Sequence, residues 1–348
     1  MALGEEEQAQ LFRKAREALE SGSRIHVVSH VDLDGLSSAA IIMRWARSKG
    51  KEVAHSVAGV RGLYTMAKRA LQGAAGKPGT VVVIADLSPR GRGDAEAIAT
   101  LAKYAKSVIW LDHHVWEEDV ETVLEKHGVI VIRDRSKVTA ELACFLTECW
   151  NDEVSKKLVE IARADDSCSE DPYGLADKWR LVLRYLDWEG LRRAAQSLSR
   201  GELWPDWARE IYEKEAPSYY REIREKTSVL IESFNGIRVA VVTPPPRASA
   251  CDVQRLGATP GPDKADVVVI VYPKGLSIKT WGRLRADCIA AKLGGGGHSN
   301  VAGAPRPSTT MGSAQIARMV ANAAKECLSQ SLGPVPSGTA YTQSRRKE

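Results

Sequence analysis

The segment Val108-Ile109-Trp110-Leu111-Asp112-His113-His114 decides the fold and points to the chemistry of the chain. Its first four residues are apolar, which is typical of a strand that is buried on both faces of a sheet. Three side chains that can bind a metal ion follow at once, where such a strand leaves the sheet. The segment therefore predicts a buried strand with a metal-centred site at its carboxyl end.

Two upstream segments have the same form. The apolar residues 25–28 lead to Asp32 and Asp34, and the apolar residues 81–84 lead to Asp86. In open parallel sheets, ligands bind outside the carboxyl ends of the strands. We therefore expect these carboxylates and the two histidines to meet at one edge of a sheet.

The first half of the chain alternates short β-branched runs with longer stretches of helical periodicity. This alternation predicts parallel βαβ units, and thus an α/β fold with a parallel sheet and flanking helices. The expected strands are residues 25–29, 53–57, 80–85, 107–111 and 129–132, and the expected helices are residues 35–47, 63–71, 95–104 and 139–150.

The second half of the chain has a different organisation. Residues 151–235 lose the strand pattern and are predicted to be helical, and strand patterns return at residues 236–242 and 265–271. We therefore expect a second, smaller α/β domain. The predicted parts are a first domain over residues 1–195, a helical linker over 196–235, a second domain over 236–332 and a disordered tail over 333–348.

Length and composition limit the class of protein. The 348 residues favour two domains, and the 44% of hydrophobic and 27% of charged residues are usual for a folded soluble chain. The net charge of +5 is compatible with a polyanionic substrate. No apolar run approaches the roughly 20 residues that span a bilayer, and the amino end is acidic, unlike a basic leader. We expect a cytoplasmic protein that does not bind a membrane.

The six cysteines form no CxxC pair and show no regular spacing. Neither a zinc finger nor a disulfide framework is therefore expected. We expect most of these cysteines to be buried thiols.

Each acidic side chain also has a structural explanation when taken alone. Asp32 and Asp34 can cap a helix that begins near Gly35, and Asp86 can open a turn. However, several carboxylates at one edge of a sheet repel each other unless a cation compensates them. Carboxylate and imidazole donors together suit Mn²⁺ or Mg²⁺. Two such ions, about 3.5–4 Å apart, activate water for phosphoester hydrolysis.

Four segments in this order resemble the four motifs of the DHH phosphoesterase superfamily: residues 29–35, 85–86, 112–114 and 164–166. Residues 294–298, followed by residues 301–303, resemble the glycine-rich signature of the DHHA1 domain that follows the DHH domain in many members. The resemblance covers about residues 20–310. It implies a DHH domain followed by a DHHA1 domain, in a group that includes RecJ-type exonucleases, oligoribonucleases and cyclic-dinucleotide phosphodiesterases.

The resemblance implies six ligands for two divalent ions, with Mn²⁺ preferred and Mg²⁺ as the alternative: His30, Asp32, Asp34, Asp86, His113 and Asp165. His30 and Asp32 bind one ion in this scheme, and Asp34 and His113 bind the other. Asp86 and Asp165 bridge the pair or lie close to it. Asp166 remains an alternative to Asp165, because a shift of one residue exchanges them.

The remaining implied roles concern orientation and the substrate. Asp112 accepts a hydrogen bond that orients a neighbouring imidazole, and His114 contacts the scissile phosphate. In the second domain, the loop of Gly295, Gly296, Gly297 and His298 holds phosphates or a terminal nucleotide, although a merely flexible loop is the alternative. The chain has Lys279 where the family often has arginine, with Arg283 further on, so a phosphate contact there loses the bidentate guanidinium geometry.

Three functions are compatible with these residues. The first is a two-metal phosphodiesterase that removes terminal nucleotides from single-stranded DNA or RNA or from short oligonucleotides. The second is a phosphodiesterase or phosphatase for cyclic or linear dinucleotides or 3′-phosphoadenosine nucleotides. The third is a RecJ-related replication scaffold without catalysis. A replication or helicase protein partner is compatible with each, and the sequence does not determine the oligomeric state.

Overall fold

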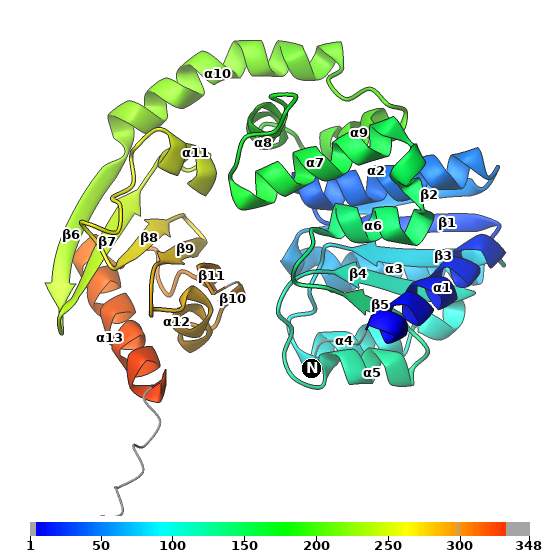
Figure 1. The fold of residues 1–348 in the computed structure, drawn as a ribbon, viewed down its shortest axis with the longest axis horizontal. Helices are drawn as coiled ribbons and strands as arrows, with labels where there is room; N and C mark the ends of the chain where they lie inside the picture. Colours follow the sequence, from blue (N-terminus) through cyan, green and yellow to red (C-terminus); the bar gives the residue numbers. More distant parts are fainter. Residues whose placement is uncertain (1–4, 298, 332–348) are drawn as a thin grey trace, which may run out of the picture. The chain divides into compact units, whose positions relative to one another are not determined.

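The computed structural model describes residues 5–297 and 299–331. The chain divides into two compact units, residues 1–222 and 223–348, which have separate hydrophobic cores (Figure 1). The predicted linker and domain boundaries stay predictions, and the predicted tail lies outside the described residues.

The first unit contains a five-stranded, entirely parallel sheet. Its order is β2-β1-β3-β4-β5, so the chain moves outward from β1 in both directions. The strands are β1 (Arg24–Ser29), β2 (Glu52–Val57), β3 (Thr80–Ala85), β4 (Ser107–Asp112) and β5 (Ile130–Arg133). Each of them overlaps a predicted strand, and the predicted α/β class is confirmed.

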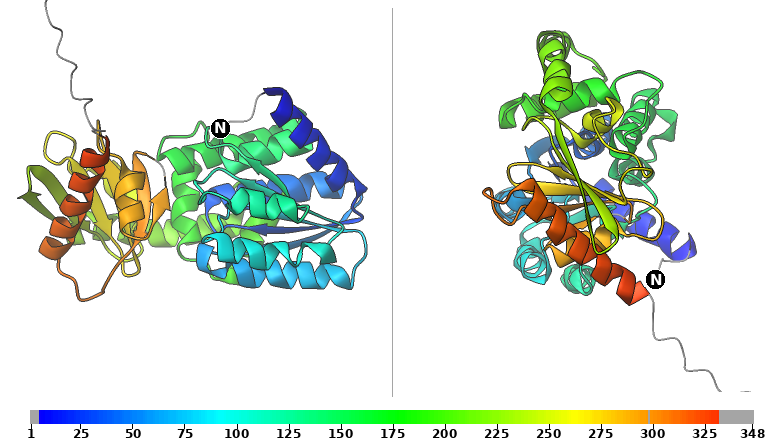
Figure 2. Two further views of the ribbon diagram at one scale, coloured as in Figure 1. Left: turned by 90° about the horizontal axis from the view of Figure 1, so that it is seen from below. Right: turned by 90° about the vertical axis from the view of Figure 1, so that its left-hand side faces the viewer.

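Helices cover both faces of this sheet, as the continuously apolar strands require (Figures 1 and 2). In β3, Val81 and Val83 belong to one core, whereas Val82 and Ile84 belong to the other. The first core is covered by α1 (Glu5–Ser21), α2 (Leu33–Ser48), α6 (Thr139–Thr147), α7 (Glu153–Ser167), α8 (Ala176–Leu183) and α9 (Trp188–Ser199). The second core is covered by α3 (Leu63–Ala75), α4 (Arg92–Ala99) and α5 (Val120–Lys126).

Two predicted helices are shorter than expected. The helix predicted over residues 95–104 ends as α4 at Ala99 and is followed by a 3₁₀ turn over Ala102–Tyr104. The helix predicted over residues 139–150 ends as α6 because Glu148 has a left-handed conformation, with φ of 51°. Helices α1 and α5 were not predicted. Both sequences are rich in charged residues, which hides their apolar faces.

The second unit contains a six-stranded mixed sheet in the order β10-β11-β9-β8-β7-β6. Among its described strands, only β7 and β8 pair in parallel. The strands are β6 (Ser228–Phe234), β7 (Ile237–Thr243), β8 (Val267–Val271), β9 (Gly275–Thr280), β10 (Gly296–Gly297) and β11 (Val301–Pro305). Helices α12 (Ala286–Lys292) and α13 (Ser313–Ser331) pack on the sheet in its core, and α11 (Ala250–Arg255) follows β7.

Strand β6 corrects the helical prediction for residues 151–235. The helix α10 (Asp206–Lys226) occupies part of that range, but β6 follows it at once. Asn235 and Gly236 have φ of 55° and 79°, and they join β6 to β7 as a tight hairpin. An Asn-Gly pair between two branched runs is the sequence signal for this hairpin, and it could have located β6.

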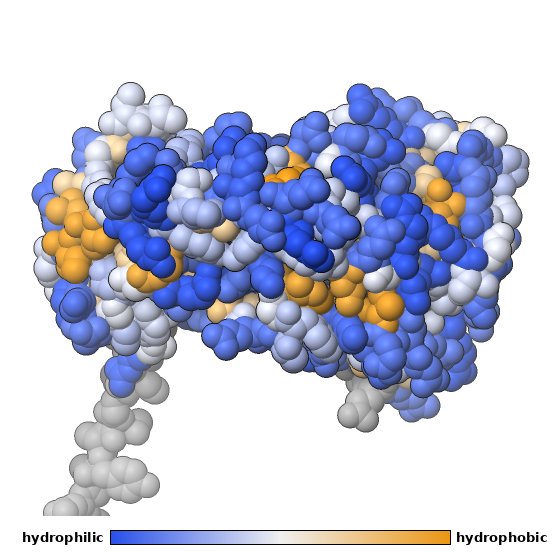
Figure 3. Space-filling view, turned by 90° about the horizontal axis from the view of Figure 1, so that it is seen from above, coloured by the Kyte–Doolittle hydropathy of each residue, from blue (hydrophilic) through white to orange (hydrophobic). Residues whose placement is uncertain are grey.

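The surface in the view of Figure 3 is mainly hydrophilic, with separate hydrophobic patches. Among the exposed large hydrophobic side chains are Val229 and Ile231 on the edge strand β6. Among the described helices, none is both long and apolar enough to cross a membrane.

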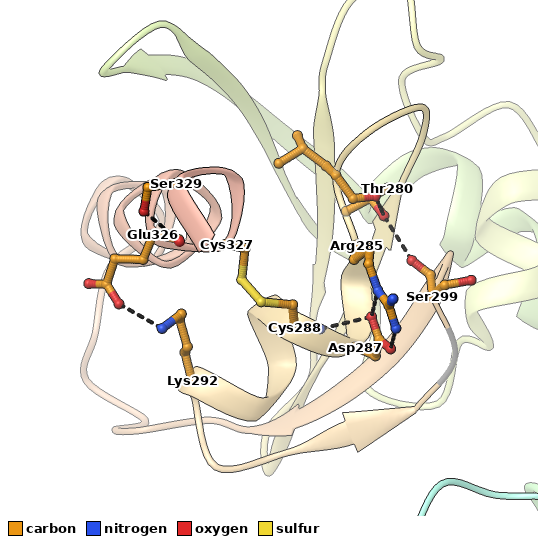
Figure 4. The surroundings of a disulfide bond; sticks show 10 residues. Thr280, Arg285, Asp287, Cys288, Lys292, Ser299, Glu326, Cys327 and Ser329 are labelled. Atoms are coloured by element: carbon orange, nitrogen blue, oxygen red, sulfur yellow. Dashed lines mark hydrogen bonds and ion pairs between the residues drawn. A yellow bond between two sulfur atoms is a disulfide. The ribbon is translucent and has the colours of Figure 1, made fainter. Parts of the chain in front are cut away.

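The prediction of buried thiols is wrong. All six cysteines are described and none is a free thiol. One disulfide joins Cys144 to Cys149 in the first unit, and another joins Cys288 on α12 to Cys327 on α13 in the second (Figure 4). The spacing of the cysteines did not reveal these pairs, because the packing of helices brings Cys288 and Cys327 together across 39 residues.

Removal of the Cys288–Cys327 disulfide is expected to lower the free energy of unfolding of the second unit by about 2–4 kcal/mol. The bond closes a chain segment of 39 residues, which restricts the unfolded chain. The double variant C288S/C327S is compared with the native protein by denaturant unfolding, with and without dithiothreitol. The C144S/C149S variant is the matched control. Its bond spans only 5 residues, so its loss should be about 2 kcal/mol smaller. Equal losses would contradict the chain-entropy explanation.

Candidate metal centre

The site lies where three neighbouring strands end. In the register of the sheet, Ser29 of β1 pairs with Ala85 of β3, and Ala85 pairs with Leu111 of β4. The residues that come next along each strand are therefore brought together: His30 after β1, Asp86 after β3 and Asp112 at the end of β4. This arrangement confirms the expectation that the acidic and histidine side chains meet at the carboxyl edge of the sheet.

Among the described residues, two groups of side chains could hold metal ions, and they share Asp86. One group is His30, Asp32 and Asp86, and the other is Asp86, His113 and His114; within each group the ligand atoms lie within 4.8 Å of one another. Oδ2 of Asp86 lies 3.7 Å from Nδ1 of His30, and Oδ1 lies 3.6 Å from Nε2 of His113. The two oxygens of one carboxylate thus face two different imidazoles.

Asp86 is held in an unusual backbone conformation. Its φ is 61°, a left-handed value that aspartate tolerates better than most residues. Its N–H donates to the carbonyl of Leu111 at 2.9 Å, and its Oδ1 accepts from the hydroxyl of Thr139 at 3.1 Å. The buried Oδ2 has no hydrogen-bond partner among the described residues. An unpaired buried carboxylate oxygen is costly, and a cation at this point would compensate it.

Asp32 and Asp34 have different partners. Asp32 caps α2 by accepting from the N–H of Gly35 at 3.1 Å, while its Oδ2 lies 2.7 Å from Nδ1 of His30. The capping explanation is therefore correct for Asp32 and leaves its second oxygen in the cluster. Asp34 is only 4% exposed. Its two oxygens accept from the N–H groups of Thr139 and Ala140, each at 2.8 Å, at the start of α6.

Asp34 also lies near the second group of ligands. Its Oδ2 is 3.8 Å from Nε2 of His113. The sequence did not single out Thr139, whose backbone and hydroxyl hold both Asp34 and Asp86. A threonine at the start of a predicted helix is a weak signal, because threonine there usually caps its own helix.

Asp165 belongs to neither group of ligands among the described residues. It lies in the last turn of α7, and its Oδ1 accepts from Nε of Arg180 at 2.6 Å. Arg180 is itself buried and also pairs with Asp177 at 2.6 Å. The charge of Asp32 contributes to raising the pKa of Asp165, and the charge of Asp166 contributes to raising the pKa of Asp34. Both aspartates thus lie near the cluster, and the alternative between Asp165 and Asp166 stays open.

The ionisation of the carboxylates reflects their crowding. Burial, together with the charge of Asp32, raises the pKa of Asp34 to about 7 and that of Asp86 well above its usual value. Burial raises the pKa of Asp165 to about 6 against the opposing charge of Arg180. Without a cation, carboxyl groups in the cluster therefore retain protons near neutral pH. The donor set fits a divalent ion that would replace those protons.

The pKa values of His30 and His114 are raised by neighbouring carboxylates. Burial alone would lower the pKa of His30, but the charge and hydrogen bond of Asp32 outweigh burial and raise it. The same reversal, due to Asp112, raises the pKa of His114 to about 10. Nδ1 of His114 lies 2.7 Å from Oδ1 of Asp112. His114 is therefore a cation at neutral pH, whereas His113 lies buried beside Asp86.

In the second unit, part of the glycine-rich segment forms a short strand that lies close to β11. Gly296 and Gly297 form β10 and pair with Gly303 and Ala302 of β11. A Cβ atom at Gly295 would lie 2.0 Å from the carbonyl oxygen of Gly303, so no larger residue fits there. His298 lies outside the described residues.

The two predicted basic residues of this unit lie on or near β9. Lys279 donates to Oε1 of Gln254 at 2.5 Å, and its ammonium lies 5.8 Å from the centre of the Trp281 ring. Arg283 lines a cavity of about 940 Å³ together with Trp281. These positions leave the predicted substrate contacts untested.

Comparisons with known proteins agree with this fold. The model of the N-terminal domain of the DHH family matches residues 24–164. A solved DHH domain described as a member of the s1p family of ribosomal proteins has a TM-score of 0.58 at 15% identity, covering 94% of this chain and 92% of that one. No curated protein matches the chain.

Two solved RecJ structures are also similar. RecJ from Thermus thermophilus in complex with Mn²⁺ has a TM-score of 0.57 at 16% identity, covering 93% of this chain. The chain spans only 56% of that protein. An exonuclease RecJ bound to manganese has a TM-score of 0.52 at 15% identity, covering 94% of this chain and 95% of that one. These likenesses show the fold, and the family match identifies residues 24–164 as an N-terminal domain of the DHH family.

Proposed function

We propose that the chain is a two-metal phosphodiesterase that hydrolyses terminal phosphodiester bonds of single-stranded or short nucleic acid. The observation that carries this proposal is the position of Asp86, whose two oxygens face His30 and His113 and which belongs to both groups of ligands. A carboxylate shared by two cation sites is the arrangement that a bridged pair of ions requires. A non-catalytic scaffold would not need it.

The proposed roles follow from the local contacts. His30, Asp32 and Asp86 would hold one ion, and Asp86, His113 and Asp34 the other, with Asp165 or Asp166 close to the pair. His114 is a member of the second group, but its positive charge and its contact with Asp112 suit a phosphate oxygen better than a metal ion. His114 would therefore bind the scissile phosphate.

The metal ions, when bound, would supply an activated water and stabilise negative charge on the phosphate oxygens. Mixed carboxylate and imidazole donors favour Mn²⁺, with Mg²⁺ as the alternative. Residues of the chain would hold these groups in place. Thr139 and Ala140 would fix the carboxylates of Asp34 and Asp86, and Asp112 would fix the imidazole of His114 and the backbone of His113.

The second unit would bind the substrate. We propose that the backbone of Gly295, Gly296 and Gly297, with His298, Lys279 and Arg283, contacts phosphates or a terminal nucleotide. The tight approach of Gly295 to Gly303 supports a defined backbone shape, which anion binding by N–H groups needs.

A time course on end-labelled DNA and RNA strands of graded length, with Mn²⁺ or Mg²⁺, tests the proposal. We expect mononucleotides to be released from one end in Mn²⁺. Activity on linear or cyclic dinucleotides alone would favour the small-molecule alternative. Absence of hydrolysis with every substrate and metal would contradict the enzyme and favour the scaffold.

Location and protein partners remain part of the proposal. Disulfides persist in oxidising compartments and in the intracellular proteins of hyperthermophiles, so the cytoplasmic location stays a prediction. A replication or helicase partner also stays a prediction.

A further inference from the structure

Trp116 and Arg133 support the Asp112-His113-His114 turn through a series of contacts. Asp112 is fully buried, and its carboxylate receives three donors. Oδ1 accepts from the backbone N–H of His113 at 2.9 Å and lies 2.7 Å from Nδ1 of His114. Oδ2 accepts from the indole N–H of Trp116 at 2.5 Å. Oδ1 of Asp112 thus contacts the two histidines, and Oδ2 contacts the tryptophan.

Trp116 is itself held in place. It is only 8% exposed, and its ring packs edge-on against Trp110 at a centroid distance of 5.5 Å. The guanidinium of Arg133 lies 4.9 Å from the centre of the Trp116 ring. Arg133 also donates to the carbonyl of His114 at 3.2 Å and to Glu121 at 2.7 Å. Asp112 at the start of the turn is therefore connected to Trp116 directly, by a hydrogen bond, and His114 at its end is connected to Trp116 through Arg133.

We propose that Trp116 is a positioning residue for the metal centre, because its indole N–H fixes the rotation of the Asp112 carboxylate that holds His113 and His114. This inference rests on the proposed function for its kinetic consequence only. Groups that orient metal ligands from outside contribute about 10–100-fold to metal affinity or activity. Without the indole N–H, the carboxylate of Asp112 can rotate. The contacts that it makes with the backbone of His113 and the imidazole of His114 are then no longer fixed.

Two substitutions separate the hydrogen bond from the packing. W116F keeps a large ring against Trp110 and Arg133 and loses the N–H. W116H loses the larger part of the ring but retains a five-membered ring whose Nε2 occupies the position of the indole nitrogen. Stability alone therefore favours W116F, because it buries more apolar surface, whereas positioning favours W116H.

We expect the two variants to rank in one order for stability and in the opposite order for metal affinity and kcat. In thermal unfolding, W116H should melt below W116F. In Mn²⁺ titration calorimetry and in kcat, W116F should lose about 10-fold or more, with KM little changed, and W116H should stay within about threefold of the native protein. If activity and metal affinity instead follow the order of stability, the inference is wrong.

An NMR measurement on the metal-free protein keeps the inference separate from the proposed function. The ring N–H that His114 donates to Asp112 should give a downfield proton signal in the native protein and in W116H, and this signal should shift or broaden in W116F. An unchanged signal in all three proteins would overturn the inference even if the native protein is an active nuclease. The expected pattern in a protein without hydrolytic activity would leave the inference standing and refute the proposed function.

Discussion

Asparagine in place of Asp86 is expected to reduce Mn²⁺-dependent hydrolysis by about 10³-fold or more. The side chain keeps its size, and asparagine accepts the left-handed backbone of this position, where φ is 61°. It can still accept from the hydroxyl of Thr139. What disappears is the negative charge between His30 and His113, so neither group retains its shared anionic ligand. The measurement is kcat/KM on an end-labelled oligonucleotide, with Mn²⁺ binding followed by calorimetry.

The matched control is D152N, the same substitution at another aspartate of the first unit. Asp152 caps α7 by accepting from Ser155 and pairs with Arg44 at 2.6 Å. Asparagine is as good a cap as aspartate, so activity should stay within about twofold while stability falls slightly. If D86N retains activity within about tenfold of the native protein, Asp86 is not a shared ligand.

The sequence predicted the part of the site that depends on strand ends. Asp86 and Asp112 follow continuous apolar runs, and such runs separated by helices are parallel neighbours whose carboxyl ends meet. The order of the strands did not need to be known, because any parallel order brings those ends to one edge. The α/β class and the meeting of the acidic residues were therefore predictable.

The supports of the site were not predictable, because they depend on packing between distant segments. Thr139 reaches Asp34 across 105 residues and Asp86 across 53 residues. Trp116 is close to Asp112 in sequence, but its hydrogen bond depends on how the ring is fixed by Trp110 and Arg133. Tryptophan in a loop gives no sequence signal that separates such a role from ordinary core packing.

Acid is expected to weaken Mn²⁺ binding, by about 10²-fold between pH 7 and pH 5. Burial and the charge of Asp32 raise the pKa of Asp34 to about 7, so below pH 7 an ion must displace a proton from this carboxyl. Each displaced proton costs about a factor of ten per pH unit. His30, whose pKa is raised by Asp32 against the effect of burial, changes the affinity in the same direction. Calorimetry in two buffers of different ionisation enthalpy measures the affinity and counts the protons released.

The same carboxyl should make the stability of the metal-free protein depend on pH in the opposite sense. The pKa of Asp34 is higher in the folded state, about 7, than in an unfolded chain. Its contribution to stability is therefore complete below about pH 4 and is lost as the pH rises through 7. Bound Mn²⁺ compensates the charge of ionised Asp34 and so prevents this loss of stability at higher pH. The increase in Tm that Mn²⁺ causes should therefore grow between pH 5 and pH 8. Binding without proton release at pH 6, or an increase in Tm that does not change with pH, would show that Asp34 is not protonated in the metal-free site and that a cation does not relieve the crowding of these carboxylates.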